Sequence, residues 1–193
     1  TGPATLAGSL VLLTAETLAA ITMINAINPK EPASFGTSIH VMDPFTALCT
    51  IGSPEQGLAG AGAIQVARSF GLSASCNVGL ADSNVPDFQA GFEKALSTCF
   101  AIAAGAEGIG AQGIVGADQG CSFEQLVIDD EWLGMVSRPF RGIEVTPETL
   151  AVDVIQNVGV GGNYLRERHT IRHLREEIWL PRLFVRQRWD RWS

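Results

Sequence analysis

Residues Ser73 to Lys94 carry the clearest fold signal in the chain, and they read Ser-Ala-Ser-Cys-Asn-Val-Gly-Leu-Ala-Asp-Ser-Asn-Val-Pro-Asp-Phe-Gln-Ala-Gly-Phe-Glu-Lys. The small and apolar residues at the start predict a short strand, and the polar turn that follows carries Asp82 and Asp87. Pro86 then precedes an Ala-rich helix, since proline suits the first turn of a helix. A strand that delivers carboxylates to its own C-terminal end is typical of α/β folds, which keep their sites there.

The same layout occurs twice more, in residues 34–43 and 106–118. Asp43, Asp82 and Asp118 are 39 and 36 residues apart, a spacing that suits one strand, one loop and one helix. Because the carboxyl ends of parallel strands meet at one edge of a sheet, we expect the three aspartates at the same end. The predicted strands lie near residues 34–41, 74–80 and 107–115.

Helices are predicted between these strands and after them. Their starts are marked by capping boxes at Ser53–Gln56 and Ser122–Gln125 and by Thr146-Pro147-Glu148. Strands that alternate with helices imply a parallel sheet with right-handed crossovers. The predicted helices cover about residues 5–27, 54–71, 86–105, 122–136, 146–159, 164–177 and 181–192.

Three parallel strands are too few for a closed barrel and leave open edges. Their order, followed by helices only, predicts the C-terminal half of a (β/α)8 TIM barrel followed by C-terminal helices. We therefore expect residues 1–145 to form the βα units of a partial TIM-barrel domain, and residues 146–193 to form a helical cap packed on the same domain. The chain opens on Thr-Gly-Pro, without Met, so we expect a fragment or a processed product.

The chain is 46% hydrophobic, yet no run approaches the roughly 18 uninterrupted apolar residues of a membrane span. We predict that the apolar segment 5–27 is a buried or interface helix, and it lacks the basic flank of a signal peptide. The residues that interrupt its apolar run are Thr14, Glu16, Thr17, Thr22 and Asn25.

Four cysteines without a C-x-x-C pair predict core thiols in a reducing cytosol, rather than a disulfide framework or a zinc ribbon. Cys76 is set apart because it lies on the strand described first. His169 and His173 are four residues apart on a predicted helix, but no third ligand accompanies them. We therefore predict a cytoplasmic protein without a metal site, in which this pair has a structural or docking role.

Charge is distributed unevenly along the chain. Residues 164–193 carry eight Arg and four acidic residues, whereas residues 1–163 carry five basic and 16 acidic residues. A basic tail can bind nucleic acid. Here the arginines alternate with acidic residues and with Trp, which favours docking against the acidic body or another chain. We predict a homo-oligomer with neither nucleic acid nor a membrane as partner.

Asp82–Lys94 resembles the D-[S/A]-x-x-P-D-x-Q-A-G-[Y/F]-E-K stretch of the trimethylamine methyltransferase (MttB-like) family. Further stretches also look like family blocks, and they occur in the family's order. The resemblance covers the whole chain, but members of the family are longer, so this chain would be their C-terminal part. These blocks are Gly2–Gly8, Gly52–Glu55, Ser122–Val127, and Gly159–Leu165 with His169-Thr170.

The resemblance implies a (β/α)8 barrel that moves a methyl group from an amine to the cobalt of a partner corrinoid protein. The chain itself would bind no cofactor, because the partner carries the methylcobamide. No pyrrolysine is visible in the sequence, which favours the branch that acts on quaternary amines. Two positions depart from the family: Phe45 stands where relatives often carry Arg, and Asn84 where they often carry His or Lys.

A quaternary ammonium cannot donate N–H hydrogen bonds, so carboxylates and aromatic faces suit it best. We therefore predict catalytic roles for Asp82, Asp43 and Asp118. The predicted substrate-binding residues are Asn77, Asn84, Phe92, Gln112 and His40. The residues predicted to face the corrinoid partner are Gly161, Gly162 and His169.

Other interpretations of these residues stay open. Asp82 and Asp87 could cap the helix start, His40 could be a satisfied structural histidine, and Phe92 could belong to the core. Gly159–Gly162 is predicted to be a tight turn between helices rather than a phosphate cradle, since it follows a helix. The alternative functions are another barrel enzyme, such as a lyase, and a non-catalytic fragment or assembly module that binds through its Arg/Trp tail.

Overall fold

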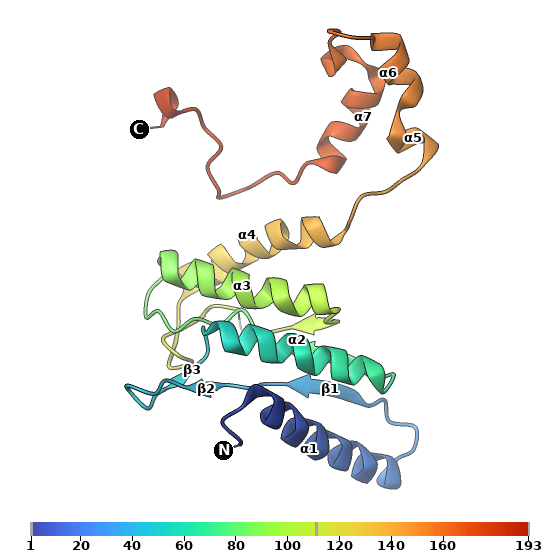
Figure 1. The fold of residues 1–193 in the computed structure, drawn as a ribbon. Coiled ribbons are helices and arrows are strands. Elements are labelled where there is room, and N and C mark those ends of the chain that lie inside the picture. The colour runs from blue at the N-terminus through green and yellow to red at the C-terminus, as the bar shows by residue number, and fades with distance from the viewer. Residues whose placement is uncertain (1, 111, 193) are drawn as a thin grey trace. The chain divides into compact units, whose positions relative to one another are not determined.

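The computed structural model describes residues 2–110 and 112–192 and divides the chain into two compact units, one ending at Asp130 and one beginning at Glu131. The first unit contains a parallel sheet in the order β1-β4-β5, of which Figure 1 labels β1. The predicted parallel α/β arrangement is thus confirmed, although within the described residues the sheet does not close into a barrel. The strands are β1 (Ser34–Thr37), β4 (Ser73–Cys76) and β5 (Gly108–Ile109).

Three helices alternate with these strands, close to the predicted bounds: α1 (Leu6–Ile27), α2 (Pro54–Ser69) and α3 (Phe88–Ala104). The core joins buried strand residues to α2 and α3. Small residues allow this close packing, since a Cβ at Gly60 would lie 2.5 Å from Cys76 Sγ. The core cluster consists of Phe35, Ala63, Ile64, Ala67, Ala74, Cys76, Val78 and Ala101.

The two faces of the sheet differ because side chains alternate along a strand. Phe35 and Ala74 are buried beneath the helices, whereas their neighbours Gly36 and Ser75 are exposed on the other face. Helices α2 and α3 therefore both cover the face of the sheet that carries the core.

All three predicted strands end earlier than expected: β1 at Thr37, β4 at Cys76 and β5 at Ile109. After β1 the chain forms the antiparallel hairpin of β2 (Val41–Met42) and β3 (Cys49–Thr50). After β5 it forms a second hairpin, of β6 (Ile114–Val115) and β7 (Gly120–Cys121). Each turn contains residues at positive φ, which a continuous strand does not accommodate.

The boundary between the units falls within α4 (Phe123–Phe140). The second unit continues with α5 (Pro147–Leu150) and α6 (Val152–Val158), separated by Ala151 at φ 52°. The 3-10 turn η1 (Tyr164–Arg166) and α7 (Arg168–Glu177) follow. Short helices thus replace the two longer helices predicted for this region.

The predicted helix over 181–192 is wrong, since the described residues there contain only the 3-10 turn η2 (Trp189–Arg191). Glu131 explains the difference. Its Oε1 accepts hydrogen bonds from the backbone N–H groups of Arg182, Leu183 and Phe184 at 2.8, 2.9 and 3.2 Å. Three consecutive N–H groups bound to one carboxylate shape this segment into a loop around Glu131.

Residues 5–27 were predicted to form a buried or interface helix, and burial is only partial. Leu10 and Leu13 pack against the core, but α1 has no fully buried residue, and Val11 is 70% and Ile27 86% exposed. By length and by its mean hydropathy of 1.8, α1 could also cross a membrane. One such helix near the N-terminus is weak evidence, because core helices and signal sequences share these properties.

The cysteines also differ from the prediction. Cys49, Cys99 and Cys121 are exposed, so they are not core thiols. Cys76 is buried, and its burial raises the pKa of the thiol. All four are free thiols.

Candidate functional site

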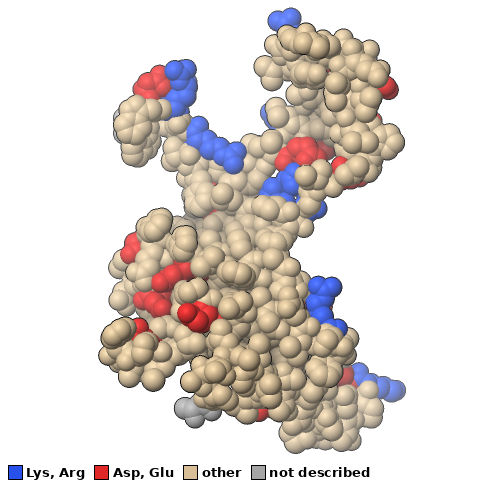
Figure 2. All heavy atoms as spheres, in the orientation of Figure 1, with Lys and Arg blue, Asp and Glu red and all other residues tan. Residues whose placement is uncertain are grey.

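Three loops converge at the carboxyl end of the parallel sheet, on the side toward which β1 points in Figure 1. Backbone hydrogen bonds join the loop after β4 to the β6–β7 turn: Ala117 N donates to Ala81 O at 3.0 Å, and Gly116 N donates to Ser83 O at 2.7 Å. Acidic side chains gather on this side of the first unit in Figure 2. The candidate site is therefore a negatively charged edge built by loops from three βα units.

Asp82 links two of these loops. Its Oδ1 accepts a hydrogen bond from Ile51 N at 2.7 Å, and its own N–H donates to Glu93 Oε2 at 2.8 Å. Asp82 does not cap a helix. The cap of α3 is Asp87, whose Oδ1 accepts from Ala90 N at 2.9 Å, and this hydrogen bond holds the pKa of Asp87 below its usual value. The predicted capping role is thus confirmed for Asp87, and Asp82 keeps its second carboxylate oxygen available for a cation.

Asp118 lies at the tip of the β6–β7 turn. Gly116, Ala117 and Asp118 have φ values of 64°, 52° and 68°, and Gln119 N closes the turn on Gly116 O at 3.0 Å. Non-glycine residues in this left-handed region are uncommon and carry strain that the surrounding structure must hold. The bonds from Gly116 and Ala117 to the loop after β4 provide that support.

His40 connects the acidic residues electrostatically. Loss of solvent around the ring lowers the pKa of His40, while the negative charges of Asp118 and Asp82 act in the opposite direction. The ring lies between Ser38 Oγ, 2.6 Å from Nε2, and Gln56 Nε2, 3.3 Å from Nδ1. The structure therefore gathers Asp82 and Asp118 around His40 in one cluster, and the predicted roles of these residues stay predictions.

A hollow of about 590 Å³ lies on the exposed sheet face, next to this cluster. Among the predicted site residues, Asn77 lines it, and Asn77 N donates to Thr37 O at 3.0 Å, which extends the β1–β4 pairing. Polar atoms from Ser38, Ser75 and Asn77 thus face a space large enough for a small ligand. Its lining is Leu13, Gly36, Thr37, Ser38, Ser75, Cys76, Asn77, Gly108, Ile109 and Gly110.

Asp43 has a different environment. Its Oδ1 accepts from Phe45 N, Thr46 N and the Thr46 hydroxyl at 2.9, 2.7 and 3.0 Å. These bonds, chiefly that from Thr46 N, hold the pKa of Asp43 below its usual value. Asp43 therefore stabilises the β2–β3 turn, and within the described residues no contact joins it to Asp82 or Asp118. Its catalytic role stays a prediction.

The other predicted ligand-binding residues lie on the same loops or on α3. Asn84 is exposed beside Gly116, where a Cβ would lie 2.9 Å from Asn84 Oδ1. Phe92 is 58% exposed and stacks on Phe88 with ring centroids 6.0 Å apart, so it does not belong to the core of this chain. Gln112 is partly buried between β5 and β6. Their roles in binding stay predictions.

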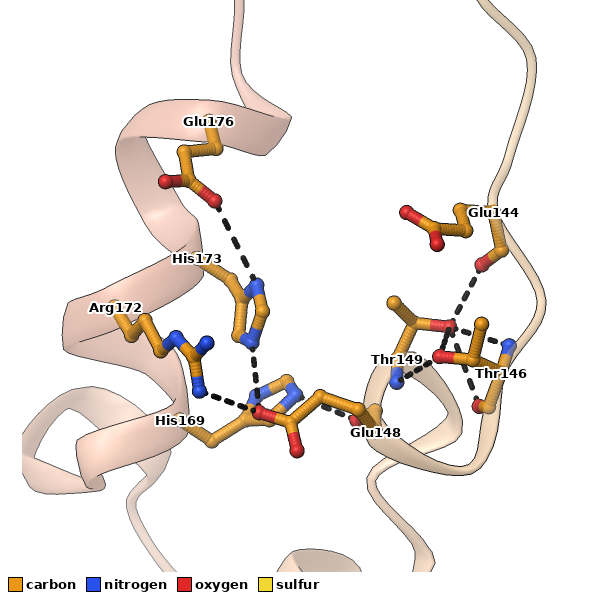
Figure 3. A network of polar contacts seen from close by, with 8 residues as sticks. All are labelled: Glu144, Thr146, Glu148, Thr149, His169, Arg172, His173 and Glu176. Atoms are coloured by element: carbon orange, nitrogen blue, oxygen red, sulfur yellow. Dashed lines mark hydrogen bonds and ion pairs between the residues drawn. The ribbon is translucent and has the colours of Figure 1, made fainter.

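In the second unit, His169 and His173 converge on Glu148 (Figure 3). His169 Nε2 lies 3.0 Å from Glu148 O, and His173 Nε2 and Arg172 Nη1 lie 3.3 and 3.1 Å from Glu148 Oε1. His173 and then Arg172 hold the pKa of Glu148 below its usual value. This network joins α5 to α7, and among the described residues no group of three metal-ligating side chains is present.

Gly161 and Gly162 form part of a tight turn between α6 and η1, as predicted. Gly161 has φ 77°, and a Cβ at Gly162 would collide with Val158. The predicted contact of these glycines and of His169 with a partner stays a prediction.

Sequence reasoning missed a buried ion pair behind the site. Lys94 Nζ lies 3.0 Å from Asp129 Oδ2 and donates to Gly79 O at 2.8 Å, with both side chains fully buried. Asp129 Oδ2 also accepts from Gly113 N at 2.6 Å. Burial lowers the pKa of Lys94, and Asp129 opposes this effect. The pair anchors the loops that follow β4 and β5. The sequence signal that could have revealed it is the Glu93-Lys94 end of the Asp82–Lys94 stretch.

Sequence reasoning also missed Gln56. The predicted capping box at Ser53 is wrong, because Ser53 makes no side-chain cap and Gln56 Nε2 instead donates to Asn77 O at 3.1 Å. The second predicted box is half present: Ser122 Oγ accepts from Gln125 N at 3.1 Å, but the Gln125 amide binds Asp129. In both helices the glutamine turns inward to a tertiary partner.

Comparison with known proteins agrees with the resemblance in the sequence. The family described as trimethylamine methyltransferase (MTTB) matches residues 1–193. The chain is similar to a glycine betaine methyltransferase of Desulfitobacterium hafniense, with 35% identity over 100% of this chain and 40% of the relative. It is also similar to trimethylamine methyltransferases of Methanosarcina thermophila and Methanosarcina barkeri, with 36% and 37% identity over 99% of this chain and 39% and 38% of the relatives. The chain spans about 40% of the length of these relatives, and over that span it belongs to the trimethylamine methyltransferase family.

Proposed function

We propose that this chain is part of a methyltransferase that moves a methyl group from a quaternary amine to the cobalt of a corrinoid protein. The observation that carries the proposal is the cluster of Asp82, Asp118 and His40 beside a hollow at the carboxyl end of the sheet. Two carboxylates beside a single imidazole leave a net negative site suited to a permanent cation. Relatives named for glycine betaine and trimethylamine support this reaction class.

The proposed reaction needs no general acid or general base from the protein. The bond between nitrogen and the methyl carbon breaks, its electron pair stays on nitrogen, and a neutral tertiary amine leaves. The partner's reduced cobalt supplies the electron pair of the new bond. The residues of this chain hold the ammonium beside Asp82 and Asp118, orient one methyl group outward and exclude water.

The fold supports a barrel as the complete scaffold. The strand order β1-β4-β5 follows the chain without reversal, and α2 and α3 cover one face only. A doubly wound sheet would place helices on both faces. We propose that the remaining length of the longer relatives completes a (β/α)8 barrel around the exposed face, with residues 146–193 as its helical cap. We further propose that the protein is cytoplasmic and homo-oligomeric.

The test mixes the full-length protein, a reduced corrinoid partner and a panel of tertiary and quaternary methylated amines, and follows cobalt methylation by absorbance. We expect methylation with at least one quaternary amine. Methylation with none of the amines would contradict the proposed function, and methylation by tertiary amines alone would contradict the assignment to quaternary substrates.

A further inference from the structure

Gln56 has the features of a side chain kept for a specific contact. It is 2% exposed, and its Oε1 has no hydrogen-bond partner, an arrangement that ordinarily destabilises a fold. Its Nε2 donates to Asn77 O at 3.1 Å and lies 3.3 Å from His40 Nδ1. Because a carbonyl oxygen only accepts, the nitrogen of the Gln56 amide must face Asn77, and this fixes the orientation of the amide.

That orientation determines the protonation of His40. The Gln56 amide nitrogen can only donate, so His40 Nδ1 must accept and carries no proton. The proton of the neutral ring is then on Nε2, which lies 2.6 Å from Ser38 Oγ and donates to it. A second proton on Nδ1 would point at the Gln56 NH₂ group. The lowered pKa of His40 is consistent with a neutral ring, although Asp118 and Asp82 favour the charged one.

The hydrogen bonds from Gln56 to His40 and from His40 to Ser38 also orient the Ser38 hydroxyl. Since the Ser38 oxygen accepts from His40, its hydroxyl proton is available to another acceptor, and within residues 2–110 and 112–192 it has no other hydrogen-bond partner. Ser38 lines the hollow of about 590 Å³. We propose that Gln56 is a positioning residue that fixes the tautomer of His40, so that the Ser38 hydroxyl donates a hydrogen bond into the hollow to a carboxylate or carbonyl oxygen of the ligand.

The ligand class rests on the proposed function, whereas the tautomer does not. If the ligand is a methylated ammonium held by the acidic cluster, the Ser38 donor selects one that also carries an oxygen acceptor. A zwitterion with a cationic head and an anionic tail has both groups, whereas tetramethylammonium has only the first.

The tautomer is tested by nitrogen-15 NMR of the histidine rings, and the chain has only three histidines, so His40→Gln assigns the signal. We expect unprotonated Nδ1 and protonated Nε2 at neutral pH. In Gln56→Glu a carboxylate replaces the donor, so the proton should move to Nδ1 or the ring should become charged. Gln65→Glu, on the exposed side of α2, is the matched control and should change nothing. A wild-type ring protonated on Nδ1 would overturn the inference, even if Gln56→Glu failed to fold.

The ligand class is tested by calorimetry on the full-length protein, with glycine betaine and tetramethylammonium as probes. Ser38→Ala should weaken binding of glycine betaine about tenfold, the effect of one hydrogen bond to a charged group, and leave tetramethylammonium within about twofold. Ser34→Ala, on the same strand outside the hollow, should change neither. Equal weakening of both probes, or of neither, would overturn the Ser38 assignment. Binding of neither probe to the wild type would count against the proposed function and its ligand class. The NMR test of the His40 tautomer does not depend on that outcome.

Discussion

Replacement of Lys94 by Met should lower the free energy of unfolding by about 3–5 kcal/mol. Lys94 and Asp129 are both fully buried, with 3.0 Å between Nζ and Oδ2. Removal of one partner leaves the other charge in an environment without water, and the loss greatly exceeds that of an exposed pair. Gly79 O would also lose the hydrogen bond that Lys94 donates at 2.8 Å. Guanidinium denaturation followed by circular dichroism measures the change.

Lys30→Met is the matched control, because Lys30 is exposed in the same unit and the substitution is identical. It should change the free energy of unfolding by less than about 0.5 kcal/mol. Equal stabilities of the two variants would show that the buried pair does not hold the loops after β4 and β5.

Replacement of Asp82 by Asn should reduce kcat/KM for methyl transfer about 10- to 100-fold, or about 1.4–2.7 kcal/mol of transition-state stabilisation. The side-chain amide keeps an oxygen for the hydrogen bond from Ile51 N, and the backbone N–H of residue 82 still donates to Glu93, so the loops stay in place. What is lost is the negative charge beside the cation. Transfer rates measured with saturating corrinoid partner, together with thermal unfolding, separate the two effects.

Asp87→Asn is the matched control, five residues further along the same loop. Asn caps a helix as well as Asp does, so both folding and transfer should be preserved. If Asp82→Asn unfolded the protein, or left transfer at the level of Asp87→Asn, the role of Asp82 would be structural.

The features that the sequence predicted correctly depend on residues close together along the chain. The parallel strands, the Asp87 cap and the helix ends near Gly71, Gly105 and Gly159 follow from short-range patterns of small, capping and positive-φ residues. Asp82 lies in the loop after β4, as the sequence predicted, although that strand ends at Cys76 and not near residue 80.

The features that the sequence missed depend on partners far along the chain. The loop at 182–184 follows from Glu131, about 50 residues earlier, and local helical signals could not reveal this contact. Gln56 matched a capping box, but His40 and Asn77 take its amide instead. The hairpins contain two-residue strands, too short to show a period, and so Asp43 was not recognised as a turn residue.

A crystal structure of the full-length protein with its quaternary amine, in the absence of the corrinoid partner, tests the central claim most directly, because the substrate then cannot react. The ammonium group should lie at the carboxyl end of the parallel sheet, against the carboxylates of Asp82 and Asp118, with one methyl group directed away from the loops. An ammonium group bound elsewhere, with these two carboxylates facing only water, would contradict the account.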